Sequence, residues 1–198
     1  MTTIDIATTE GDVVLIMQET RLRVSSVILS SASPVFKAMF GPNFKEGQGD
    51  RSAQHPKDVP LPDDEPLVMT RFCRLLHCQR GLPETHEEDS QDMRAKGLLD
   101  LVVLADKYGC MERVQMACGY ILFDLTASSK PQDMPMTALM YLIAVAFMLE
   151  DHRHFTLFTR QLVMDHVDNY SAVATHPALA VLPNLFLRKC IVSQSSCL

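Results

Sequence analysis

The clearest strand patterns lie near the start of the chain. Val13–Met17 is a continuous apolar run, which predicts a strand buried on both faces. Residues 21–24 alternate polar and apolar side chains, as expected of a half-buried strand. Glu19 and Thr20 provide a turn between the two runs, so the pattern predicts a β-hairpin.

Two short helices are predicted to follow the hairpin. Ser25 or Ser26 can cap a helix that starts near Val27. Ser33 can cap a second helix with Pro34 in its first turn, where the missing proline N–H costs nothing. The apolar side chains of this second helix fall on one face, at Val35, Phe36, Met39 and Phe40.

The next segment is polar and then extended. Residues 44–56 contain glycine, serine and proline with little apolar content, which predicts a mobile loop. Residues 58–62 include two prolines, which forbid a helix and restrict this segment to a sheet edge. Asp63 or Asp64 is then expected to cap a helix. The apolar residues of this helix are spaced for one face, at Leu67, Val68, Phe72, Leu75 and Leu76.

The middle of the chain predicts a loop and two helices. Residues 81–94 carry five acidic side chains, which indicate a solvated loop. Helices are expected over residues 98–108 and 112–125, with a tight link at 109–111.

The last third predicts mainly helices. Residues 127–135 are rich in serine and proline and form the best internal boundary. Helices are expected over 137–149, which is apolar on nearly all sides and must be sandwiched, and over 152–167. In the tail we expect a turn of helix at 178–182 and a weak helix at 184–192. Strands followed by helices indicate an α+β fold, with a small antiparallel or mixed sheet covered by helices.

Composition narrows the functional classes. The net charge of -6 and the pI of about 5.6 disfavour both nucleic acid and acidic membranes as partners. The most apolar run, residues 138–149, is shorter than the roughly twenty residues that a membrane span needs. Residues 1–12 lack the pattern of a secretory signal. The six cysteines are therefore expected to be unpaired, mostly buried thiols in the cytoplasm, the nucleus or both.

The motifs of common active sites are incomplete. Residues 41–47 look like a phosphate loop but lack its Gly-Lys-Ser/Thr ending. Residues 86–88 begin like a zinc-protease helix, but Ser90 replaces the second histidine. Cys73 and His77 share a helix face, yet core packing explains them better than zinc. We therefore expect no catalytic residue, no cofactor and no metal site.

Several segments together resemble one family. They are GDVVL at residues 11–15, LRVSSVIL at 22–29, ASPVFKAMF at 32–40, FKE at 44–46, VPLPDD at 59–64 and LADKYGC at 104–110. This combination resembles the BTB/POZ domain, especially the forms common in fungi. Ser25-Ser26 stands where many animal members have His-Lys. The resemblance implies a BTB/POZ domain over residues 1–126 and a helical extension over 127–198 with a weakly structured C-terminal tail.

The resemblance also implies a function and its partners. BTB/POZ domains are protein–protein interaction modules that self-associate or recruit cullin-type ubiquitin ligases. Phe44-Lys45-Glu46 looks like the family's apolar-X-Glu cullin-binding motif. The alternative is that Phe44 folds onto the core and Glu46 is solvated. Only ten residues precede Gly11, so the strand-swapped family dimer is not expected, although another homodimer remains open.

Three functional hypotheses follow. The first is an intracellular, non-enzymatic adaptor that links a partner to a cullin-type ubiquitin ligase. The second is an oligomerising scaffold or transcription-regulatory partner with no ligase role. The third is an enzyme with an unrecognised site, which a deep pocket holding a desolvated acid or histidine would indicate.

Overall fold

The computed structural model describes residues 1–79, 90–128, 133–165 and 176–182. The chain divides into two compact units. Unit 1 comprises Met1–Glu84 and Val103–Val114, and unit 2 comprises Thr85–Val102 and Gln115–Leu198. The two units are defined by contacts within the chain, so they do not test the domain boundary expected after residue 126. That boundary stays a prediction.

Unit 1 is built on a four-stranded sheet with the order β1-β3-β2-β4. The strands are β1 (Thr2–Asp5), β2 (Val13–Met17), β3 (Thr20–Val24) and β4 (Lys57–Pro60). β2 and β3 form the predicted antiparallel hairpin, and β4 pairs with β2 in parallel at the predicted edge. β1 was not predicted, because its side chains are mostly exposed and carry no apolar pattern. It pairs in parallel with β3, which makes the sheet mixed.

Two capped helices follow the hairpin, as predicted. α1 (Ser26–Ala32) has Ser25 as its N-cap, and α2 (Pro34–Met39) has Ser33. The core beside α2 is aromatic: the ring of Phe36 stacks on that of Tyr108, with centroids 4.4 Å apart. The adjacent polar segment was expected to be a loop, and it contains one short 3-10 turn, η1 (Lys45–Gly47).

The predicted cap of α3 (Pro66–Leu76) was wrong. Glu65 is the N-cap, not an aspartate, and its carboxylate accepts the Val68 N–H at 2.7 Å. Asp64 instead is buried and accepts the Tyr108 hydroxyl at 2.7 Å and the Lys107 ammonium at 2.8 Å. Of the apolar residues spaced for one face, Val68 and Phe72 are buried together with Met69 and Cys73, whereas Leu67 is exposed.

Two long helices each have residues in both units. α4 (Gln91–Lys107) begins seven residues earlier than predicted, so the acidic segment expected to be a loop up to residue 94 is helical from Gln91. α5 (Met111–Ser128) follows the predicted tight link. Gly109 in that link has a φ of +65°, a conformation that glycine adopts without strain.

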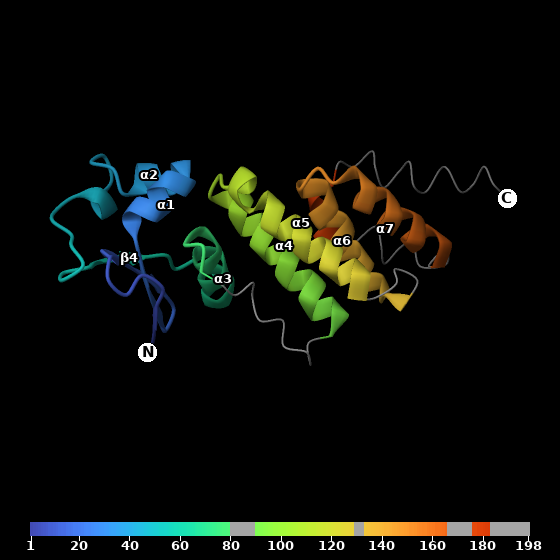
Figure 1. The fold of residues 1–198 in the computed structure, drawn as a ribbon, viewed down its shortest axis with the longest axis horizontal. Coiled ribbons are helices and arrows are strands. Elements are labelled where there is room, and N and C mark those ends of the chain that lie inside the picture. Colours follow the sequence, from blue (N-terminus) through green and yellow to red (C-terminus); the bar gives the residue numbers. More distant parts are fainter. Residues whose placement is uncertain (80–89, 129–132, 166–175, 183–198) are drawn as a thin grey trace. The chain divides into compact units, whose positions relative to one another are not determined.

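The helices of unit 2 include α6 (Met136–Met148), α7 (His152–Asp165) and the 3-10 turn η4 (Pro177–Val181). α6 buries most of its side chains and packs against α7 and η4, which confirms that this apolar helix is sandwiched (Figure 1). No helix among the described residues has the length and apolar character to cross a membrane. The helix expected at residues 184–192 lies outside the described residues.

Candidate partner-binding site

An open apolar groove of about 520 Å³ lies on unit 1. We call it the α2–β4 groove, because it lies between α2, the η1 segment and the end of β4. Its lining residues are Pro34, Val35, Ala38, Met39, Phe44, Glu46, Pro60 and Leu61. Two residues of the predicted cullin-binding motif, Phe44 and Glu46, are therefore in this groove, whereas Lys45 between them is not among its lining residues.

α2 contributes to the core and to the groove at once. Phe36 and Phe40 are one helical turn apart and both are buried in the core. Val35 and Met39 form a parallel row that lines the groove, and Val35 is 38% exposed. The four residues were predicted to fall on one face of this helix, and the structure divides them into a buried row and a row that lines the groove. Two adjacent apolar rows on so short a helix were the signal for a second, exposed apolar surface.

Phe44 and Glu46 are both available to a partner. Phe44 is 50% exposed, so much of its ring is not covered by the core. Glu46 is partly exposed, and its carboxylate has no hydrogen bond or ion pair to any residue that the structure describes. The groove therefore combines an apolar surface with a carboxylate that no described residue pairs.

The segment after the motif is tied to the core by Arg51. Its Nε lies 3.2 Å from a carboxylate oxygen of Asp12, and its Nη1 donates to the Phe40 carbonyl at 3.3 Å. Asp12 also accepts hydrogen bonds from the backbone and the hydroxyl of Ser26, at 2.7 and 2.6 Å. The ion pair thus links this segment to the hairpin and to the first turn of α1.

The structure accounts for Cys73 and His77 without a metal. His77 donates through Nδ1 to the Cys73 carbonyl at 2.7 Å and accepts the Ser25 N–H at Nε2, at 3.1 Å. Both ring nitrogens are thereby occupied, and burial lowers the pKa of His77. Burial also raises the pKa of the Cys73 thiol. Among the described residues, no group of three or more His, Cys, Asp or Glu side chains could hold a metal ion.

The described cysteines are free thiols. Cys73, Cys110 and Cys118 are buried. Cys78 is exposed, because α3 ends at Leu76 and Cys78 adopts a positive φ of 51° in the turn that follows. Cys190 and Cys197 lie outside the described residues.

Comparison with known proteins identifies the family. The family model of the BTB/POZ domain matches residues 7–123, which is more than half of the chain. A search of the curated proteins finds no match. The α+β fold with a mixed four-stranded sheet agrees with this family, whose domains mediate protein–protein interaction. The chain therefore belongs to the BTB/POZ domain family.

Proposed function

We propose that this protein is a non-enzymatic adaptor that recruits a cullin-type ubiquitin ligase through the α2–β4 groove. One observation carries the proposal: Phe44, which is 50% exposed, and the carboxylate of Glu46, which no described residue pairs, line the same apolar groove. Because the described cysteines are free thiols, which reducing compartments preserve, we also propose that the protein is located in the cytoplasm, the nucleus or both.

The groove suits a partner that presents an apolar side chain beside a hydrogen-bond donor. The apolar side chain would pack against Phe44, Val35 and Met39 and remove their surfaces from water. A partner N–H group or cation would donate to Glu46, and charge-assisted hydrogen bonds of this kind are stronger than neutral ones. Aromatic residues at the centre of such contacts dominate binding energies.

The test is a calorimetric titration against the N-terminal domain of a BTB-binding cullin from the same host. Phe44→Ala should weaken binding roughly 30-fold, because an aromatic hot spot contributes about 2 kcal/mol. Glu46→Gln, which keeps the shape but removes the charge, should weaken binding roughly tenfold. Phe123→Ala is the matched control, because Phe123 is also an exposed phenylalanine (56%) but lies on α5, outside the groove.

Each outcome has a clear meaning. Binding that is weakened by these factors in both groove variants and is unchanged in Phe123→Ala supports the adaptor and its site. Binding that survives both groove changes moves the site elsewhere, and no binding by the wild type refutes the ligase role.

If the wild type does not bind the cullin domain, an oligomerising scaffold becomes the leading hypothesis. The observation in its favour is Val27, which is 74% exposed on α1. Sedimentation of the wild type beside Val27→Asp tests self-association through that residue. A dimer that Val27→Asp dissociates would support the scaffold, and a monomeric wild type would exclude it.

A further inference from the structure

The segment that carries the docking motif is closed on itself by backbone hydrogen bonds. The Phe44 N–H donates to the Gly41 carbonyl at 3.4 Å, and the Gly47 N–H donates to the Phe44 carbonyl at 3.0 Å. The Gln48 N–H donates to the Lys45 carbonyl at 3.3 Å. A Cβ at Gly47 would lie 1.8 Å from the Gly41 carbonyl oxygen, so only glycine allows this close backbone approach.

One side chain from the sheet joins this segment from outside. The Lys57 ammonium donates to the Lys45 carbonyl at 2.7 Å and also to the Gln48 carbonyl. These two carbonyls lie on either side of Glu46 in the chain. Lys57 therefore bridges the turn at the two points that flank the motif carboxylate, and hydrogen bonds from a charged donor are stronger than neutral ones.

Lys57 itself is fixed by the sheet. It is the first residue of β4, its N–H donates to the Asp12 carbonyl at 2.9 Å, and it pairs with Val13 of β2. The buried strand β2 thus sets the position of the Lys57 backbone. The Lys57 ammonium in turn holds the segment that carries Phe44 and Glu46 in place relative to the sheet.

We propose that Lys57 is a positioning residue of the docking motif: it orders the Phe44–Glu46 turn before the partner arrives. This inference rests on the proposed function and adds its preorganisation. A turn that is already ordered loses less conformational freedom on binding, so the complex is tighter. Lys57 is not a groove-lining residue, so its effect is transmitted through the Lys45 and Gln48 carbonyls.

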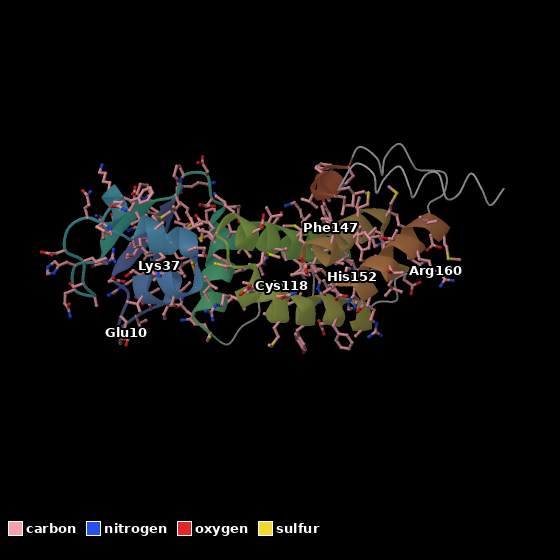
Figure 2. The ribbon with its side chains drawn as sticks, turned by 90° about the horizontal axis from the view of Figure 1, so that it is seen from above. Glu10, Lys37, Cys118, Phe147, His152 and Arg160 are labelled. Atoms are coloured by element: carbon pink, nitrogen blue, oxygen red, sulfur yellow. The ribbon has the colours of Figure 1, made fainter. Side chains whose placement is uncertain are left out.

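The test compares Lys57→Met, Lys57→Arg and Lys37→Met in the calorimetric titration against the cullin domain. Lys57→Met keeps an unbranched side chain that is one atom shorter and loses both hydrogen bonds, so binding should weaken roughly tenfold. Lys57→Arg should restore most of the affinity, because a guanidinium can donate to both carbonyls. Lys37→Met changes the net charge equally. Lys37 lies on α2 (Figure 2) but does not line the groove, so its loss should have no effect.

Amide hydrogen exchange tests the same residue without a partner. In Lys57→Met the Gly47 and Gln48 amides should exchange roughly tenfold faster, whereas the Leu15 amide in β2 should be unchanged. If the wild type does not bind the cullin domain, the proposed function fails, and the exchange rates still decide the role of Lys57. Equal exchange at Gly47 and Gln48 in both proteins would overturn the inference. So would equal affinity of the wild type and Lys57→Met, or an equal loss in Lys37→Met.

Discussion

Ser33 joins two parts of unit 1 through a single hydroxyl group. The residue is 1% exposed and is the N-cap of α2. Its Oγ accepts the Phe36 N–H at 3.0 Å and donates to the Tyr108 carbonyl at 2.6 Å. Ser33→Ala removes both hydrogen bonds and leaves the backbone unchanged. Because α2 carries part of the groove, this substitution also tests how the groove is supported.

The expected cost follows from those two contacts. Loss of an N-cap serine typically costs about 1 kcal/mol. A buried carbonyl that loses its donor costs about 1–3 kcal/mol. The Cys110 thiol lies 3.5 Å from the Tyr108 carbonyl, but a thiol is a weak donor and replaces little of the loss. Ser33→Ala should therefore lower the free energy of unfolding by about 2–4 kcal/mol.

Ser25→Ala is the matched control. Ser25 is also a buried serine N-cap, 3% exposed, but among the described residues its Oγ accepts only the Ile28 N–H, at a long 3.5 Å. Its loss should cost less than about 1 kcal/mol. Urea unfolding followed by circular dichroism gives both values. If Ser33→Ala costs no more than Ser25→Ala, the link to the Tyr108 carbonyl contributes nothing and the reasoning is refuted.

Three further predictions concern other groups. His77 accepts a hydrogen bond in its neutral form, and burial lowers its folded pKa below the ordinary 6.5. The free energy of unfolding should therefore fall as the pH drops below about 6.5 and level off below the folded pKa. Urea midpoints between pH 5 and 8 (about the range of histidine titration) should show this slope, and His77→Gln should abolish it. In native protein, alkylation mapped by mass spectrometry should label Cys78 long before Cys118, which is buried and whose pKa burial raises to about 12; equal labelling would contradict the structure. Gly109→Ala should cost about 1–2 kcal/mol or more, because φ is +65° and the new Cβ would lie 2.9 Å from Pro34 Cγ; an unchanged melting temperature would be the contrary result.

Features that depend only on neighbouring residues were predictable from the sequence. The hairpin of β2 and β3 follows from a buried run, a turn and an alternating run. Ser33 and Pro34 specify the start of α2, because a serine oxygen can accept an N–H two or three residues on and proline loses nothing at the first helical position. The sequence motifs also indicated the family and predicted a docking role for Phe44 and Glu46.

Choices between equivalent local options were not predictable. Asp63, Asp64 and Glu65 all precede α3 and each has a side chain that can cap a helix. Tyr108, 44 positions along the chain from Asp64, accounts for the outcome, because it provides a buried donor that Asp64 satisfies, and Glu65 caps the helix. β1 is a similar case, since this segment becomes a strand by pairing with β3 and not because of a pattern in its own side chains.

The sequence by itself therefore determined the α+β class, the hairpin, the caps of α1 and α2 and the family. It also predicted Phe44 and Glu46 as part of a docking motif, which stays a prediction. Only the tertiary structure decided that these two residues share a groove with Val35 and Met39 of α2 and with Leu61 after β4. The physical reason is range. Caps, turns and periodic patterns are settled by residues a few positions apart, whereas a groove forms only when the sheet brings separate segments of the chain together.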